Sequence, residues 1–216
     1  MSGARGTVRK YFDVGPTSIT AGGVYTGGAT GWASGIASVN LANQWLTSLT
    51  NGTGDNQRVG QSIAVETLDL RVKISPDPTG LNQTLRMIVF ADNECDGAYP
   101  ADAELLIQST IATGANLSFL QPAYFGRFKI IEDKHFDWQQ LPGTHPIFHE
   151  SHHDLKGHRV MWDTTDLSTI SNARKGHIFI FFYWESRSVA AGGIITQTLA
   201  NPPAVQYVSR IRYRDE

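Results

Sequence analysis

The chain has a single cysteine, Cys95, among its 216 residues, so no disulfide can form within one molecule. A fold held together by disulfides is therefore excluded, and the protein does not need an oxidising compartment for its stability. Acidic residues flank Cys95 in the sequence. They predict a raised pKa for its thiol, which would make it a poor nucleophile.

Long apolar runs and an excess of basic residues are also missing. No segment approaches the roughly 20 apolar residues of a membrane-spanning helix. The first residues, MSGARGTVRKYF, lack the apolar core of a signal peptide, so we expect no secretion. The 18 lysines and arginines are outnumbered by 20 aspartates and glutamates, and the formal net charge is −2.

The remaining composition is that of an ordinary globular protein. Hydrophobic residues make up 41% and charged residues 18% of the chain, which argues against intrinsic disorder. The 21 glycines predict many turns, as a fold of many strands requires. All-β sandwiches of this length commonly form one domain.

Alternating apolar residues predict a long strand over residues 62–75. Ile63 and Val65 share one phase of the two-residue repeat, whereas the apolar residues from 68 to 74 share the other. We therefore expect a bulge near Glu66 and Thr67, because one extra residue switches the phase.

The other predicted elements are mostly strands. Residues 177–184 are apolar on both faces, which predicts a central strand buried on both sides. A short helix is expected to begin near residues 99–102 and to end at about residue 108, inside one connection. Further strands are expected at residues 84–91, at 126–133, once or twice within 135–162, and at 205–214. Short strands, long loops and a helix inside a connection favour a two-sheet jelly roll over a meander barrel.

Three sequence blocks, in order, resemble one known family. The first is a loop carrying Arg58 and Gly60, which leads into a strand with TLDLR at residues 67–71. The second, residues 85–106, is a strand that ends in an acidic, glycine-containing loop. The third is RFKIIEDK, with Arg127 at its start and Asp133 near its end. The set resembles the single jelly-roll coat proteins of small circular single-stranded DNA viruses and of their relatives near satellite tobacco necrosis virus.

The resemblance implies an all-β fold, an eight-stranded jelly-roll sandwich of two antiparallel four-stranded sheets with one or two short helices in its loops. It also implies an N-terminal arm or extended segment over residues 1–34 and a capsid domain over residues 35–216. Arg58, Gly60, Arg127 and Asp133 are then assembly or structural residues.

The function implied is that of a viral capsid protein without enzymatic activity. Copies of the chain, about sixty in the simplest closed shell, would enclose a single-stranded nucleic-acid genome inside a virion, and a host receptor would be a further partner. An alternative on the same fold is a jelly-roll carbohydrate-binding or adhesion module that is not an enzyme.

Nucleic-acid contact is expected from two groups of basic residues. Coat proteins of this type usually carry a long basic N-terminal arm, but here the start of the chain offers only Arg5, Arg9 and Lys10. Either the chain begins after such an arm, or its genome is neutralised by other means. The second group lies on one face of the last predicted strand, which alternates between apolar residues and Arg210, Arg212 and Arg214. A solvated or subunit-contacting face is the alternative for that strand.

Residues 149–153, HESHH, match the H-E-x-x-H pattern of zinc peptidases. In those enzymes two histidines lie one helical turn apart and bind zinc, and the glutamate acts as general base. The flanking sequence, with Pro146 upstream, does not predict an amphipathic helix. We therefore expect a polar loop or hairpin here, or a pH-sensitive contact between subunits, since several histidines would gain charge near pH 6.

An acidic loop offers oxygen ligands for a metal at Asp92, Glu94 and Asp96. The loop is not an EF-hand, because Ala103 occupies the position of the bidentate glutamate. No cofactor is expected, apart from calcium between subunits, which shells of the resembling family sometimes hold. An ordinary solvated turn is the alternative.

Overall fold

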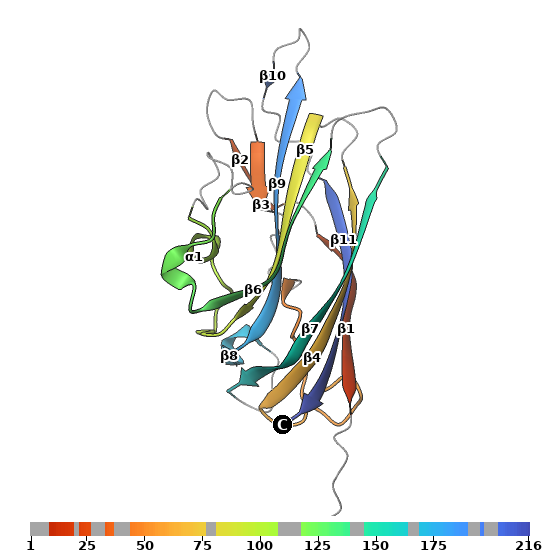
Figure 1. The fold of residues 1–216 in the computed structure, drawn as a ribbon, viewed down its shortest axis with the longest axis vertical. Helices are drawn as coiled ribbons and strands as arrows, with labels where there is room; N and C mark the ends of the chain where they lie inside the picture. Colours follow the sequence, from red (N-terminus) through yellow and green to blue (C-terminus); the bar gives the residue numbers. More distant parts are fainter. Residues whose placement is uncertain are drawn as a thin grey trace, which may run out of the picture.

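The protein's strands form two facing antiparallel sheets, with a small helix on the outer side of one of them (Figure 1). The structure is a computed structural model, and it describes residues 9–19, 22–26, 33–36, 44–76, 81–107, 118–138, 145–163, 169–189, 195–196 and 203–216.

Within these residues the first sheet has five strands in the order β1-β11-β4-β7-β8. Its strands are β1 (Lys10–Ile19), β11 (Ala204–Asp215), β4 (Ser62–Ser75), β7 (Ile147–Trp162) and β8 (Ala173–Lys175). A 3-10 turn, η4 (Ile170–Asn172), precedes β8.

The second sheet follows the order β2-β3-β9-β5-β6, with β10 beside β9. Its strands are β2 (Gly22–Thr26), β3 (Ala33–Ile36), β9 (His177–Val189), β5 (Leu81–Asp92), β6 (Phe128–Trp138) and β10 (Ile195–Thr196). In the described chain, β11 lies between β1 and β4, and β9 lies between β3 and β5, so segments distant in sequence are neighbours in both sheets. The prediction of an all-β, jelly-roll-like sandwich is confirmed. Both sheets are wider than the expected four strands, because β8 extends the first, and β2 and β10 extend the second.

Part of the expected N-terminal arm or extended segment, residues 1–34, is a strand of the first sheet. Lys10–Ile19 forms β1, which pairs along β11 from Lys10 opposite Tyr213 to Ile19 opposite Val205. A short segment of mixed polar and apolar residues can form a strand when a partner strand supplies the hydrogen bonds and the apolar face, and the sequence of residues 1–34 does not reveal such a partner.

The bulge predicted in β4 is confirmed. The pairing of β4 with β7 shifts register between Val65 and Thr67, and Ile63 and Val65 are buried on one side of the shift. Beyond it, every second residue from Leu68 to Ile74 is buried. The bulge therefore keeps both apolar sets of the strand in the core between the sheets, although they have different phases.

The central strand predicted at residues 177–184 is also confirmed, as β9 between β3 and β5. Its second face packs under the connection between β5 and β6, which carries α1 (Asp102–Leu105) and the 3-10 turn η3 (Pro122–Tyr124). The helix is shorter than the one expected to reach residue 108. This second core cluster includes Trp45, Phe90, Leu105, Leu106, Phe128, Phe179 and Phe181.

The outer face of the five-stranded sheet is different. Along β11 buried and exposed residues alternate, and no described segment covers the exposed side. The two outer faces of the sandwich therefore meet different surroundings, packed side chains on one side and solvent on the other. None of the helices in the described ranges has the length and apolar content needed to cross a membrane.

Candidate functional site

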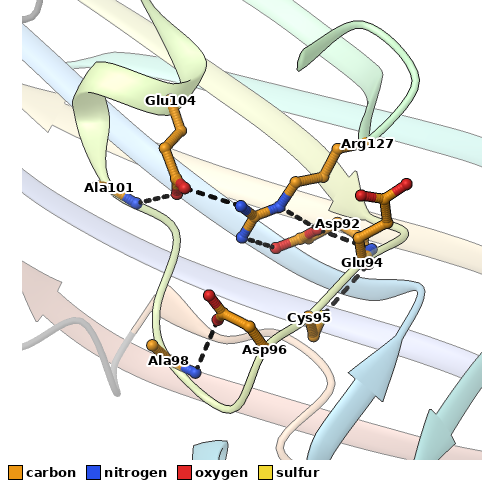
Figure 2. Close-up of polar contacts among 8 residues, drawn as sticks. All are labelled: Asp92, Glu94, Cys95, Asp96, Ala98, Ala101, Glu104 and Arg127. Carbon is orange, nitrogen blue, oxygen red and sulfur yellow. Dashed lines mark hydrogen bonds and ion pairs between the residues drawn. The ribbon is translucent and has the colours of Figure 1, made fainter. Parts of the chain in front are cut away.

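Arg127, the first residue of the RFKIIEDK block, holds the helical connection to the sheet (Figure 2). Its Nε and Nη2 donate to the two carboxylate oxygens of Asp92, each at 2.9 Å, and its Nη1 donates to Glu104 Oε1 at 2.8 Å. Asp92 is completely buried at the end of β5, and Glu104 lies in α1. The hydrogen bonds from the guanidinium to Asp92 raise the pKa of Arg127. Arg127 therefore has a structural role inside one chain.

The acidic loop does not gather its three carboxylates as a metal site would require. Asp92 faces Arg127, Glu94 is exposed, and Asp96 accepts a hydrogen bond from the backbone N–H of Ala98 at 3.1 Å (Figure 2). Among the described residues no group of three or more His, Cys, Asp and Glu side chains could hold a metal ion. Asp92, Glu94 and Asp96 therefore do not form a metal site within one chain, and calcium between subunits stays a prediction. Asp92 is bound by Arg127, Glu94 is exposed, and Asp96 accepts a hydrogen bond from the backbone of its own loop.

Cys95 lies in the same loop and is buried. Burial, together with the charge of Asp92, raises the pKa of its thiol to about 12. The prediction of a poor nucleophile agrees with this environment.

Asp133, near the other end of the RFKIIEDK block, pairs with an arginine that the sequence analysis missed. Arg86, on β5, donates through Nε and Nη2 to the two oxygens of Asp133 at 2.8 and 2.6 Å. Its Nη1 donates to the carbonyl oxygen of Ser118 at 2.5 Å. Arg86 is only 4% exposed. The sequence contained a signal for this pair, namely an arginine inside the apolar run LRMIVF, because a charge in a buried strand requires a partner.

Arg58 and Gly60 belong to a second buried arrangement. The Arg58 side chain is fully buried, stacks on the Trp162 ring at 4.4 Å and donates through Nη1 to the carbonyl oxygen of Gly60. Gly60 has a φ of +87°, a conformation that favours glycine. The loop is also tied to the C-terminal strand, because the Val59 N–H donates to Asp215 Oδ1 at 2.8 Å. The described contacts of this motif lie within the subunit.

His177 lies next to this arrangement and was also missed. Its ring meets the Trp162 ring edge-on at 4.8 Å, and its Nδ1 accepts from Trp45 Nε1 at 3.1 Å. The remaining nitrogen, Nε2, must then carry the proton and donate to the Met161 carbonyl oxygen, at 2.8 Å. Complete burial lowers the pKa of His177 to about 3, and the nearby Arg58 charge adds to this shift.

The HESHH pattern lies on strand β7 and not on a helix. His149 Nε2 and His153 Nε2 lie 2.6 and 3.0 Å from the two oxygens of Glu132 on β6, while Glu150 is exposed and pairs with Arg71 at 3.4 Å. The glutamate and the two histidines of the pattern therefore face opposite sides of the sheet, which does not fit the zinc-peptidase arrangement.

Glu132 forms a polar contact between the edges of the two sheets. Burial would raise the pKa of its carboxyl group, but hydrogen bonds from Ser151, His149 and His153 outweigh it, and the pKa is lowered. An ionised carboxylate only accepts, so both histidines donate to it. The histidine contacts of this cluster are made inside the subunit. The expected pH-sensitive contact between subunits is not tested by a single chain.

The basic residues expected to bind nucleic acid are already paired with carboxylates, except for Arg5, which lies outside the described residues. Lys10 is buried, Arg214 is half-buried, and the other described arginines of the two groups are exposed. The pairs and their N···O distances are Arg9–Glu66 (3.1 Å), Arg214–Glu66 (2.9 Å), Arg210–Asp13 (2.7 Å), Arg212–Asp69 (2.8 Å) and Lys10–Asp215 (2.8 Å). This arrangement reduces the positive potential available to a phosphate backbone.

The pairs Arg210–Asp13 and Arg212–Asp69 lie on the outer face of the five-stranded sheet. The strand register places Asp13, Arg210, Asp69 and His152 side by side across β1, β11, β4 and β7. An open depression of about 490 Å³ lies over this row. We regard this surface as the candidate functional site.

The sequence matches no known protein-family model, and a comparison with curated proteins also found no match.

Proposed function

We propose that this chain is a viral capsid protein that assembles with copies of itself into a small closed shell around a nucleic-acid genome. The observation that carries the proposal is the jelly-roll-like strand order. The three sequence blocks that resemble viral coat proteins supply β4, β5 and β6 of this order, together with the arginine–carboxylate pairs beside them. Viral coats are a common use of this architecture. The shell, its copy number and the virion are parts of the proposal.

The braced connection between β5 and β6 supports a role in contacts with neighbours. Arg86 and Arg127 hold this connection to the sheet, and its Ile107, Phe119 and Phe125 are exposed by 49%, 81% and 63%. Apolar side chains displayed on an anchored segment are costly in water and are typical of interaction surfaces.

The test is size-exclusion chromatography with light scattering and negative-stain microscopy on the purified chain. About sixty copies of a 23.7 kDa chain would give a particle of roughly 1.4 MDa. The ratio of absorbance at 260 and 280 nm across that peak reports packaged nucleic acid. A chain that stays monomeric or trimeric at every pH and salt concentration would overturn the proposal.

A paired substitution, Phe119→Ser with Phe125→Ser, sharpens this test. We expect it to abolish large particles while the far-ultraviolet circular dichroism of the subunit is retained. Val59→Ser is the matched control, since it removes an apolar side chain that is 48% exposed in a different loop.

One observation favours the alternative, a carbohydrate-binding or adhesion module. A recess of about 410 Å³ is lined by Phe119 and Phe125 together with Asp133 and His135, and aromatic rings beside polar groups can stack on sugars. A monomer that binds glycans, and loses this binding in Phe119→Ser, would establish that function in place of the shell.

A further inference from the structure

The charged row on the outer face of the five-stranded sheet alternates from strand to strand between carboxylates and nitrogen-bearing side chains. Asp13 lies opposite Arg210, Arg210 opposite Asp69, and Asp69 opposite His152. The outer neighbours of the row are in contact: Arg210 binds both oxygens of Asp13 at 2.7 Å, and His152 Nδ1 lies 2.5 Å from Asp69 Oδ1.

The alternating order of this row is self-complementary when a second copy of the chain is related to the first by a two-fold axis. A two-fold axis parallel to the strands, between β11 and β4, exchanges β11 with β4 and β1 with β7. Two sheets placed face to face about that axis bring Arg210 of one copy opposite Asp69 of the other. The same rotation brings Asp13 opposite His152, so every charged position of the row meets a group that can pair with it.

The neighbouring row on one side contains Tyr11, Arg212, Thr67 and Asp154 in register across the four strands. The rotation places the Tyr11 hydroxyl opposite the Asp154 carboxylate, and Arg212 opposite the Thr67 hydroxyl. Neither contact opposes like charges.

We infer that the outer face of the β1-β11-β4-β7 sheet is a two-fold contact surface for a second copy of this chain. The occupant follows from charge complementarity. A polyanion would have to displace carboxylates from Arg210 and Arg212. A second copy instead brings its Asp69 to Arg210 and its Arg210 to Asp69, while the ion pairs within each subunit remain.

Exposed apolar side chains on the same face indicate that it contacts a protein partner and does not simply face solvent. An antiparallel sheet that faces solvent usually shows polar residues there. Here Tyr11, Phe148 and Val208 are exposed by 47%, 71% and 38% on the strands of this sheet. The role of this surface as the two-fold contact of a shell rests on the proposed function. The same contact would also form a dimer of two copies without a shell.

The test exchanges the charges within one pair. Asp13→Arg combined with Arg210→Asp keeps opposite charges between β1 and β11. The aspartate introduced at position 210 lies beside Asp69 of its own subunit, and in the face-to-face dimer it also meets Asp69 of the other copy. We expect the association measured by light scattering to weaken at least about tenfold, because like charges would be opposed across the contact. The matched control exchanges another exposed pair, Asp163 and Arg174, outside the charged row, and should assemble like the wild type.

A second variant separates this contact from a folding defect. Asp69→Lys with His152→Glu should also fail to associate alone, because the lysine introduced at position 69 would meet Arg210. Mixed with the first variant it should recover association, since three contacts of the hetero-pair then join opposite charges and the fourth returns His152 to Asp13. A defect within each subunit would not be rescued by mixing.

The outcomes distinguish the contact from the shell. Wild-type particles that are lost in each variant and restored on mixing support both. A wild-type dimer with the same behaviour supports the contact and overturns the shell. Particles that form equally well in either variant alone overturn the contact and leave the shell standing. A wild-type monomer at all concentrations overturns both.

Discussion

The two sheets of this sandwich use charge in opposite ways on their outer faces. Under the β5–β6 connection, Arg127 and Asp92 form a buried brace, and both partners are at most 10% exposed. On the open sheet, Arg71 and Glu150 are paired but remain 76% and 69% exposed. A buried charge without its partner is strongly unfavourable, whereas an exposed charge returns to water at little cost. The covered face therefore uses ion pairs to hold the subunit together, and the open face has pairs that remain available to a partner molecule.

The largest expected effect is on the buried brace. Arg127→Met leaves the Asp92 carboxylate buried and without its guanidinium, so we expect a loss of about 3–5 kcal/mol in the free energy of unfolding. Urea denaturation measures it. Asp92→Asn in the same chain should recover part of the loss, because it removes the stranded charge. A loss below about 1 kcal/mol would contradict the difference between the faces.

A second test uses the buried His177, whose pKa of about 3 lies far below its unfolded value near 6.5. Between these values the unfolded chain binds a proton that the folded chain does not. Stability should therefore fall as the pH drops from about 6.5 towards 3, by up to about 1.4 kcal/mol per unit. His177→Gln should flatten this slope, measured as unfolding free energy against pH. An unchanged slope would show that His177 is not the responsible group.

A smaller effect is expected at Glu132, which lies between the sheet edges and is partly exposed. Its lowered pKa means that its contribution is present above the unfolded value near 4.5 and is lost as the pH falls below it. Glu132→Gln should cost about 1–2 kcal/mol at pH 7, because two histidines and Ser151 lose a charged acceptor. Thermal unfolding at pH 7 and pH 3 checks this, and the difference between variant and wild type should shrink at the lower pH.

The smallest effect on stability is expected on the open face. Arg71→Ala should change the free energy of unfolding by less than about 1 kcal/mol, since exposed pairs contribute little. It is the direct counterpart of Arg127→Met in the same urea experiment. A cost of several kcal/mol would show that the open face also holds the subunit together.

The elements found from the sequence share one property. The bulge in β4, the two-sided burial of β9 and the alternation along β11 all follow from the apolar pattern of a single segment. A two-residue repeat reports which face of a strand is buried, so these features were accessible without a partner strand. The resemblance also selected Arg127 and Asp133, but it did not supply their partners.

The features that were missed depend on distant segments. Arg86 pairs with Asp133 across 47 residues of sequence, and His177 receives its hydrogen bond from Trp45 across 132 residues. The acidic loop was expected to suit a metal because its carboxylates are close in sequence. Asp92 instead binds the guanidinium of Arg127, which lies 35 residues away in the sequence. A short pattern reports which groups are present and not which groups they meet.

By itself, then, the sequence determined that this chain folds into strands and which strand faces are apolar, because strand periodicity is local. Only the tertiary structure decided that residues 10–19 belong to the sheet and that the arginines of β11 are paired, since Arg210 and Asp13 lie 197 residues apart. Charges separated this far meet only when the fold brings their strands into register, and that register decides which surface is left for a partner.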